Sequence, residues 1–448
     1  MIAQASSKRP PMRRDDSIAL VFPYGRDTVT VEVPRRCLLP LPEPRCEPAL
    51  ANPAEAVRQA LASPFGAERL RDLARGQRDC VIAVPDHKRW TPVSIMLPLL
   101  LEELHGAGLS AEQITILVAL GTHEPMSREE LRRHLGPAIC DGYRVLNHDW
   151  RDGSNLVRVG CTRRGTPVVV NRLYYEAALK VALGSVKPHG VVGWGGGAKI
   201  LQPGLGDGCG AGVTHWWSAQ GMGREIIGRV ETEVRHDIED AADRIGLDFL
   251  LQGAPNNREE MIGFFAGDFR EAYRRAAGYS LARSDFFFNA KLGPRADILI
   301  TGTTGLDMWN GGTSGMWLAE YLLKRGGTVV QFAPCSGGVA SQHPDVARYG
   351  YRSLAETEAL LESARITDRV AAAHMVHSGR VLDRMGVECI LFSNGLSREE
   401  VERLRLTYAS SPQEAVDMAL ARHGRSASVH VFGEFDRQRD ADCSPGGD

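Results

Sequence analysis

The sequence predicts an α/β fold of two domains with parallel-rich sheets and an active-site cleft between them. Three observations predict it: short continuous apolar runs typical of buried parallel strands, helical spacing between these runs, and a second strand–helix series near residue 290. The chain has 448 residues, which is enough for two or three domains. We expect an N-terminal domain at 17–285 and a C-terminal domain at 290–435, with residues 1–16 and 436–448 disordered.

The first half of the chain alternates between strand and helix patterns. Two strands around a turn are expected in 17–34, helical spacing follows in 54–76, and "CVIAVPD" (Cys80 to Asp86) is a buried strand. A helix in 92–108 leads to a second buried strand, "ITILVALGTH". Ser127 and Glu130 have the spacing of a capping box at the start of the next helix. "LKVALGSVKPH" supplies a further strand, so this order favours a parallel sheet.

The second half is predicted in two parts. The segment from Thr214 to Gly278 is charged and is expected to be helical. A new strand–helix series then begins with "ADILITGT" and continues through "GTVVQFAP", "VECILFSNG" and "ASVHVFGEF". This second series predicts the second α/β domain.

Composition excludes several classes of protein. The net charge of −2 gives no basic footprint for nucleic acid. No apolar run reaches the roughly 18 residues of a membrane span, and the first residues lack the apolar core of a secretory signal. The nine cysteines form no CxxC pair, so a disulfide framework and a cysteine zinc site are not expected. We therefore expect a cytoplasmic protein with reduced thiols and with neither nucleic acid nor a membrane as a partner.

Polar side chains follow three of the predicted strands. Asp86, with His87, Lys88 and Arg89 behind it, ends the first buried strand, His123 ends the second, and Lys187 and His189 end the third. A single histidine of this kind is more often structural than catalytic. Ligands of open parallel sheets bind at the carboxyl ends of the strands, and three such ends together favour a functional site.

A glycine-rich stretch, "KPHGVVGWGGGAKILQPG", follows the third strand. It does not fit a P-loop, because Lys199 is preceded by Ala198 and followed by Ile200 rather than by Ser or Thr. A structural turn in which two backbone segments pass closely would explain the glycines. Backbone N–H groups of such a loop could also bind an anion.

Several ordered blocks give the chain a resemblance to a known family. They are "PYG", "DHKRWTP", "ILVALGTHEPMSREEL", "LNHDW", "GTPVVVN", "GSVKPHGVVGWGGGAKILQPG" and "TTGLDMWN". In this order they resemble the nickel-dependent lactate racemase family across most of residues 20–430. The resemblance implies a nickel-pincer nucleotide, a pyridinium mononucleotide that holds nickel through sulfur, carbon and sulfur and is linked to a lysine. It also implies that cofactor-synthesis enzymes act on this protein.

The resemblance assigns roles to individual residues. Lys199, ten residues after His189, matches the lysine that tethers the cofactor, and His215, sixteen residues further, matches the nickel ligand. An imidazole nitrogen suits such a nickel ion. His123 and His189 match the two acid/base histidines. The remaining assignments are Arg89 at the substrate carboxylate, Asp86 at the cofactor ribose, and Trp194, Gly195, Gly196 and Gly197 beside the cofactor phosphate.

The implied reaction is the racemisation or epimerisation of a small-molecule 2-hydroxy acid, which would make the protein an isomerase. One histidine takes the hydroxyl proton, the carbon-bound hydrogen leaves as a hydride to the cofactor, and hydride returns to the opposite face. Two alternatives stay open: other hydride-transfer chemistry on a hydroxy or sugar acid, and a nucleotide-binding protein without catalysis. The sequence does not specify the oligomeric state.

The chain departs from the family pattern at the expected substrate contacts. Lys88 replaces a threonine, and Gly312 and Gly315 stand where the family has a glutamine and a lysine. We expect these glycines to open space for a larger or differently charged 2-hydroxy acid, with Lys88 or Trp309 taking over some contacts. Four other histidines have weaker expected roles: a supporting role for His148, a cleft-facing loop position for His343, and a structural or surface role for His374 and His377.

Overall fold

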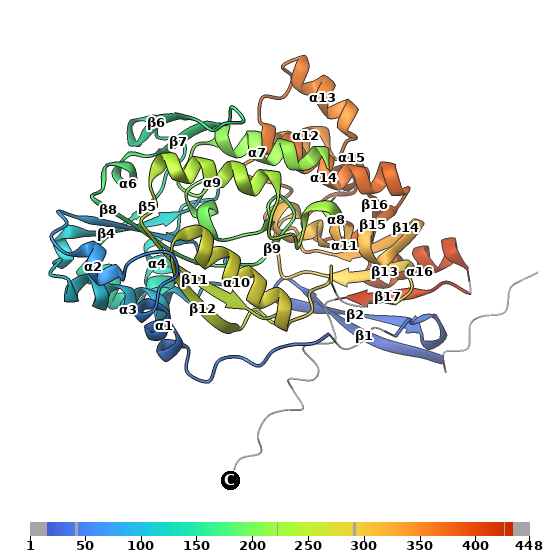
Figure 1. The fold of residues 1–448 in the computed structure, drawn as a ribbon. Helices are drawn as coiled ribbons and strands as arrows, with labels where there is room; N and C mark the ends of the chain where they lie inside the picture. The colour runs from blue at the N-terminus through green and yellow to red at the C-terminus, as the bar shows by residue number, and fades with distance from the viewer. Residues whose placement is uncertain (1–15, 41–43, 222, 290–292, 425, 433–448) are drawn as a thin grey trace, which may run out of the picture. The chain divides into compact units, whose positions relative to one another are not determined.

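The computed structural model describes residues 16–40, 44–221, 223–289, 293–424 and 426–432 (Figure 1). The predicted disordered ends lie almost wholly outside these residues. The chain forms two compact units. The six-stranded unit comprises 42–291 and 341–380, and the five-stranded unit comprises the described parts of 1–41, 292–340 and 381–448.

The predicted domain boundaries need correction in two places. The expected change near residue 290 agrees with the unit boundary at 291/292, but residues 17–41 and 341–380 each belong to the other unit from the one predicted. The hairpin of β1 (Ser17–Tyr24) and β2 (Asp27–Pro34) belongs to the five-stranded unit, because its apolar side chains are buried against the core of that unit. Leu20, Phe22 and Val31 are buried in the same core as Ile300 of the five-stranded sheet.

The six-stranded sheet has its strands in the order β12-β11-β8-β3-β4-β5. All neighbouring pairs are parallel except β11 and β12, which are antiparallel. In this order the strands are β12 (Met261–Gly267), β11 (Phe249–Pro255), β8 (Leu179–Ser185), β3 (Cys80–Pro85), β4 (Ile114–Ala119) and β5 (Arg144–Asn147). The expectation of an all-helical segment from 214 to 278 is therefore wrong. Two buried strands lie there between the charged helices α9 (Glu233–Ile245) and α10 (Phe269–Arg283), whose composition dominates the segment.

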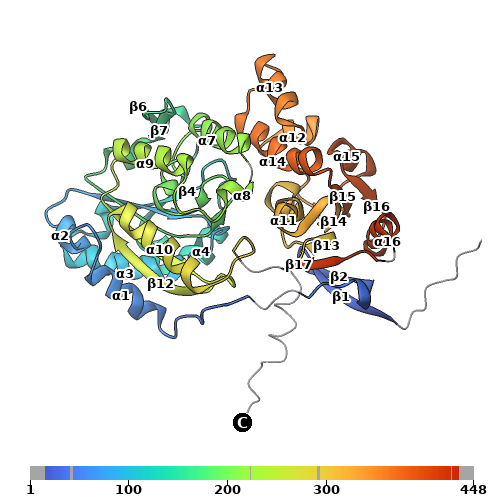
Figure 2. The same cartoon turned by 45° about the vertical axis from the view of Figure 1, so that its right-hand side comes forward.

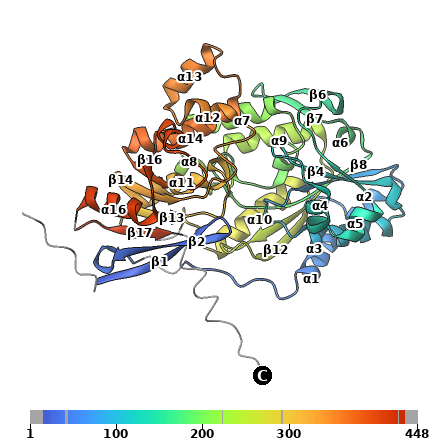
Figure 3. The same cartoon turned by 180° about the vertical axis from the view of Figure 1, so that it is seen from behind.

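Both faces of this sheet are buried, as the continuous apolar runs predict. Ile82 and Val84 of β3 pack in one core with α1, α2 and α3, and Val81 and Ala83 pack in the opposite core with α6 and α9 (Figures 1 and 3). The single helical stretch expected in 54–76 is two helices, α1 and α2, because Gly66 between them has a φ of +66°. The remaining helices of this unit are α1 (Pro53–Ala62), α2 (Leu70–Ala74), α3 (Val93–Gly106), α4 (Arg128–Leu135), α5 (Pro137–Gly142), α6 (Arg172–Glu176), α7 (Gly208–Gln220), α8 (Gly223–Ile226), α12 (Pro344–Tyr349) and α13 (Leu354–Glu362).

Two antiparallel strand pairs, a helix cap and one long helix complete the outline of the six-stranded unit. The hairpin of β6 (Leu156–Cys161) and β7 (Pro167–Asn171) and the two-residue pair of β9 (Pro188–His189) and β10 (Gly193–Trp194) are both antiparallel. The capping box predicted at Ser127 and Glu130 is present at the start of α4. The helix α14 (Arg369–Met385) begins in this unit and ends in the other.

The five-stranded sheet is parallel throughout, in the order β16-β15-β14-β13-β17 (Figure 2). Its strands are β13 (Ala296–Gly302), β14 (Leu323–Phe332), β15 (Glu388–Phe392), β16 (Thr407–Ala409) and β17 (Val429–Phe432), and its helices are α11 (Ser314–Leu322), α15 (Arg398–Arg403) and α16 (Pro412–His423). The predicted second strand–helix series is thus present. The mixed α/β class with parallel-rich sheets is confirmed for both units.

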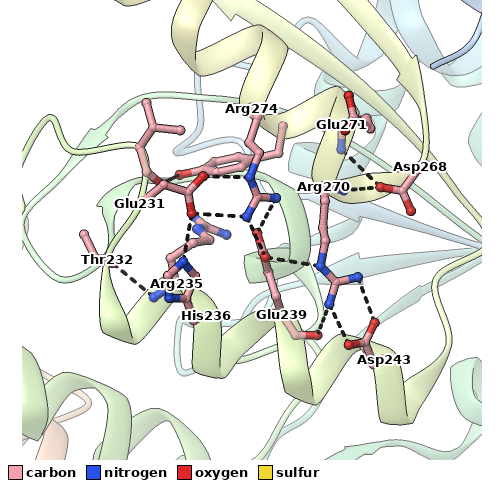
Figure 4. A network of polar contacts seen from close by, with 12 residues as sticks. Glu231, Thr232, Arg235, His236, Glu239, Asp243, Asp268, Arg270, Glu271 and Arg274 are labelled. Atoms are coloured by element: carbon pink, nitrogen blue, oxygen red, sulfur yellow. Dashed lines mark hydrogen bonds and ion pairs between the residues drawn. The ribbon is translucent and has the colours of Figure 1, made fainter. Parts of the chain in front are cut away.

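An ion-pair network joins α9 to α10 (Figure 4). Arg274 lies 2.6 Å from Glu231 and 3.0 Å from Glu239, and Arg270 lies 2.6 Å from Asp243. Because α9 carries Arg235 and α10 carries Tyr273, this network holds in place two residues that support the glycine-rich loop.

Two expectations from composition can be compared with the described residues. Within them no helix is long and apolar enough to cross a membrane. The eight cysteines of the described part are all free thiols. The ninth, Cys443, lies outside the described residues.

Candidate active site

The carboxyl ends of β3, β4 and β8 carry the predicted polar residues. These strands are adjacent, in the order β8-β3-β4, so their ends meet at one edge of the six-stranded sheet. Asp86 follows β3 and His123 follows β4, and the Nδ1 atom of His123 lies 2.5 Å from Oδ2 of Asp86. The fold thereby brings two residues that are 37 positions apart in the sequence into direct hydrogen-bond contact.

Asp86 is a buried carboxylate whose negative charge is already stabilised by neighbouring protein groups. Its exposure is 1%, its Oδ1 atom accepts a hydrogen bond of 3.0 Å from the Lys88 backbone N–H, and the Arg89 Nε atom lies 3.6 Å away. Burial raises the pKa of Asp86, but the hydrogen bond from His123 and the charge of Arg89 outweigh it and lower the pKa far below its usual range. Asp86 therefore stays ionised and orients His123.

His123 is held as a neutral base. Burial lowers its pKa more than the hydrogen bond to Asp86 raises it, so the neutral ring is favoured. Because Nδ1–H donates to the Asp86 carboxylate, the proton of the neutral ring stays on Nδ1. The Nε2 lone pair is left to accept a proton.

The hydrogen bonds of His189 fix the opposite tautomer of the ring. Its Nδ1 atom accepts a hydrogen bond of 3.1 Å from the Val191 N–H, which places the proton of the neutral ring on Nε2. Burial, with the charges of Lys199 and Arg89, lowers its pKa well below the usual value. The two histidines thus differ: Nε2 of His123 accepts a proton, and Nε2 of His189 donates a hydrogen bond.

The glycine-rich loop is a close backbone crossing. Gly196 has a φ of +83°, and a Cβ atom there would lie 2.8 Å from the Ser185 carbonyl oxygen. A Cβ at Gly197 would lie 3.0 Å from the Tyr273 ring. The Arg235 guanidinium lies 4.0 Å over the Tyr273 ring and donates to the carbonyl groups of Gly196 and Trp194. Of the three glycines, only Gly195 has merely ordinary contacts, so Gly196 and Gly197 are required by the fold itself.

The side chain of Trp194, which was predicted to lie beside the cofactor phosphate, is fully enclosed by the protein. Its side chain has no exposed surface, packs edge-on against Phe286 at 5.2 Å, and donates Nε1–H to the Gly228 carbonyl at 2.8 Å. An indole enclosed in this way has no face for a cofactor. The Trp194 side chain therefore anchors the loop, and any contact of this residue with a cofactor would be made by its backbone.

Lys199 and His215 have the features expected of a tether and a ligand. Lys199 lies in the turn of 3-10 helix Gly197–Ile200, and its amine makes no hydrogen bond or ion pair with any residue that the structure describes. Burial and the charges of Arg89 and Arg235 lower its pKa strongly, which favours the neutral, nucleophilic amine. On α7, His215 donates Nδ1–H to the Ala211 carbonyl at 2.7 Å, so its Nε2 lone pair is available to a metal.

A second carboxylate–histidine pair comes from residues that the sequence interpretation gave little weight. Nδ1 of His343 lies 2.6 Å from Asp368, and its Nε2 lies 3.4 Å from the Thr122 hydroxyl, next to His123. Both residues belong to 341–380, the segment that packs with the six-stranded unit. The sequence signal was the loop "SGGVASQHPD" alone, and only the fold brings it to Thr122.

The remaining predicted histidines are structural. His374 and His377 are buried on α14, where His377 Nε2 lies 2.9 Å from Ser218 of α7. His148 is buried and bonds the Gly206 carbonyl at 2.9 Å. These findings agree with the structural roles expected for them.

The predicted substrate contacts are divided between the units. Arg89 is partly buried beside Asp86, whereas the Lys88 side chain is exposed. Trp309 lies in the five-stranded unit, where its backbone N–H bonds the Val339 carbonyl at 3.0 Å.

Gly312 and Gly315 do not open space. A Cβ atom at Gly312 would lie 2.4 Å from Met308 Sδ, and one at Gly315 would lie 2.7 Å from Val329 Cγ1 and 2.8 Å from Gln331 Oε1. Neighbouring core atoms already occupy the volume that side chains would need. The expectation that these glycines enlarge a site is wrong, because they are required by close packing inside the five-stranded unit.

The fold and this site define an α/β protein whose parallel sheet presents two histidines, a partly buried lysine and a third histidine with one ring nitrogen that bonds no described residue. Residues 24–217 match the family described as the lactate racemase N-terminal domain. This match confirms the predicted resemblance to the lactate racemase family.

Two curated relatives support this relation. The chain is 28% identical over 329 residues to the lactate racemase of Thermoanaerobacterium thermosaccharolyticum, covering 71% of this chain and 74% of that protein. It is 27% identical over 394 residues to the lactate racemase of Lactiplantibacillus plantarum, covering 84% and 88%.

Solved structures show the same fold. The lactate racemase apoprotein from T. thermosaccharolyticum matches with a TM-score of 0.78 at 24% identity, covering 93% of this chain and 98% of that one. A Thermotoga maritima protein matches with a TM-score of 0.65 at 19% identity, covering 85% and 96%.

Proposed function

We propose that this protein is an isomerase that racemises or epimerises a 2-hydroxy acid with a nickel-pincer nucleotide. One observation carries the proposal: His123 and His189 are both partly buried and both favour the neutral ring, but hydrogen bonds to opposite partners give them complementary Nε2 atoms. A reaction that removes a proton from a hydroxyl group and later restores it needs both a proton acceptor and a hydrogen-bond donor. The two lactate racemase relatives support the same reaction class.

The residues present fit the proposed cofactor. Lys199 offers an amine without a partner in the described part of the chain, held in its nucleophilic form, and so suits a covalent tether. His215 offers one ring nitrogen fixed by its bond to Ala211, which suits a single protein ligand to nickel. No group of three or more His, Cys, Asp or Glu side chains among the described residues could hold a metal ion, so the other donors would come from the nucleotide. When bound, the nucleotide would supply the acceptor for the hydrogen on the substrate's C2 atom.

The side chains of this protein would handle the proton and the charge. His123 would take the hydroxyl proton of one enantiomer through Nε2, and Asp86 would stabilise the imidazolium that forms. His189 would donate a hydrogen bond from Nε2 to the oxygen from its own side. His123 would return this proton to the oxygen when the opposite enantiomer forms, while His189 keeps its Nε2–H. Arg89, whose guanidinium is partly exposed beside Asp86, would hold the substrate carboxylate.

The test of the cofactor assignment is made on protein produced together with the cofactor-synthesis enzymes. Peptide mass mapping is expected to find a covalent adduct on Lys199, with about one nickel per chain in the intact protein. The Lys199→Arg variant is the matched control and is expected to carry neither. An unmodified Lys199 and no bound nickel in the wild-type protein would rule the proposal out.

A further inference from the structure

Lys187 is a charged side chain at the site for which the mechanism above has no use. Its backbone is fixed, because the Lys187 carbonyl accepts a hydrogen bond of 2.7 Å from the Gly195 N–H. Its side chain is partly buried, and the ammonium lies 5.2 Å over the Trp90 ring. Trp90 directly follows Arg89, so Lys187 lies against the loop that carries the proposed carboxylate ligand.

Lys187 lies on the same side of the backbone as His189. His189 lies opposite Gly193 in the pairing of β9 with β10, and the Lys187 carbonyl bonds the Gly195 N–H, so the pairing continues to Lys187 and the two side chains share a face. A Cβ atom at Gly195 would lie 3.6 Å from Lys187 Cγ and 3.9 Å from His189 Cδ2. Both side chains therefore run past the same small residue, toward the same region.

The charge on Lys187 has no anion of its own. Among the described residues it forms no ion pair and no hydrogen bond through its amine. Asp86, the buried carboxylate in its neighbourhood, is already bonded to His123 and to the Lys88 N–H, and Glu259, which also attracts the charge, is exposed. Burial and repulsion by Arg89 lower the pKa of Lys187 to about 8. Two neighbouring cations with one engaged carboxylate form a place that an incoming anion would stabilise.

We propose that Lys187 binds a carboxylate group of the substrate together with Arg89, an assignment that rests on the proposed function of His189. Lys187, rather than the exposed Lys88, is then the second cation of the substrate site. The pair favours substrates with a full negative charge next to the reacting carbon. A second carboxylate on the substrate would be bound more tightly still, because it would give each cation its own partner.

The first test measures the reactivity of the Lys187 amine and does not depend on catalysis. The full chain without cofactor is labelled with trace acetic anhydride at pH 8, and the labelling of Lys187 is measured by peptide mass spectrometry. Lactate and malate are each expected to slow labelling of Lys187 severalfold, and glycerol is expected to leave it unchanged. Lys180, at the start of β8 with its amine on the Ala177 carbonyl at 2.9 Å, is the internal control and should not respond. Protection by inorganic phosphate alone would assign Lys187 to a phosphate and overturn the proposal, as would equal labelling in all solutions.

The second test uses the cofactor-loaded protein. Lys187→Gln is expected to raise KM about tenfold or more with a smaller change in kcat, since a charge-assisted contact to the bound substrate is lost. Lys187→Arg should restore most of this loss, and Lys180→Gln should behave like wild type. An unchanged KM in Lys187→Gln would overturn the proposal. A wild-type protein without racemase activity would overturn the proposed function instead, while the labelling result would still decide the role of Lys187.

Discussion

The two units both present the carboxyl ends of parallel strands, but they treat the polar groups there differently. In the five-stranded unit these groups bond one another: the Thr303 hydroxyl accepts from the Gly305 N–H at 3.0 Å, and the Ser393 hydroxyl donates to the Pro334 carbonyl at 3.0 Å. In the six-stranded unit the amines of Lys187 and Lys199 and the Nε2 atoms of His123, His189 and His215 make no such bond with any residue that the structure describes. A strand end is a functional site when its titratable groups keep bonding capacity for a ligand, and here this holds for the six-stranded unit.

The sharpest way to break this comparison is to remove the histidines of the six-stranded unit. His123→Asn and His189→Asn are each expected to lower kcat by about 10²–10⁴-fold, the usual contribution of a general acid or base. Initial rates on cofactor-loaded protein measure the effect. His423→Gln in the five-stranded unit, where the ring lies 2.8 Å from the Thr328 hydroxyl, is the control and should keep its rate. An equal loss in His423→Gln would contradict the division of roles.

The second prediction concerns Gly315 of the five-stranded unit. Gly315→Ala is expected to destabilise the protein by up to about 3 kcal/mol, because the new methyl group would overpack a filled core. Urea unfolding measures this. Gly278→Ala in α10, where no atom lies within 4 Å of the added Cβ, is the control and should be neutral or stabilising. If Gly315→Ala were as stable as wild type, the start of α11 would have the open space that the sequence interpretation expected.

The third prediction concerns acid sensitivity of the six-stranded unit. Burial, with repulsion from His343 and His215, lowers the pKa of His374 to about 3, whereas an unfolded histidine titrates near 6.5. The unfolded state therefore binds a proton that the folded state refuses, and stability is lost as the pH falls from about 6.5 toward 3. At pH 5 this amounts to about 2 kcal/mol.

His374→Gln should remove that share of the acid sensitivity. The free energy of unfolding of wild type is compared with that of the variant at pH 7.5 and pH 5. The variant is expected to lose less stability between the two pH values, whatever its stability at pH 7.5. The same loss in both proteins would show that His374 does not carry the effect.

The smallest expected difference lies between two arginines on helices. Arg274→Gln breaks a network that includes Glu239, whose side chain is 6% exposed, and should cost about 1 kcal/mol or more. Arg403→Gln on α15 breaks an exposed pair with Glu399 and should cost about 0.3–0.5 kcal/mol. Thermal unfolding at low salt compares them. Equal costs would mean that Glu239 is compensated by Arg270 alone.

The sequence could predict the features of the candidate site that follow from neighbouring strands. Asp86, His123 and His189 each end an apolar run, and adjacent parallel strands bring such ends together, so their convergence follows from the pattern. It could not predict the pair of His343 and Asp368, because the chain leaves the five-stranded unit for 40 residues there without a change in composition.

The roles of the glycines and of Trp194 also depend on packing in three dimensions. A glycine that gives access to a ligand and one that admits a neighbouring side chain have the same letter in the sequence. Contacts of Gly196 with the Ser185 carbonyl and of Gly315 with Val329 decide between these roles. In the same way, Phe286 and Phe288 enclose Trp194 only after the fold brings them to it.

The most direct test of the account follows the hydrogen on the C2 atom of the substrate. Cofactor-loaded protein is given a 2-hydroxy acid that it racemises, labelled with deuterium at C2, in ordinary water, and the opposite enantiomer is isolated and examined by mass spectrometry. If His123 and His189 handle only the hydroxyl proton, as proposed, the product retains the C2 deuterium. Loss of the label to water would mean that a histidine removes the C2 hydrogen as a proton, and would contradict the account.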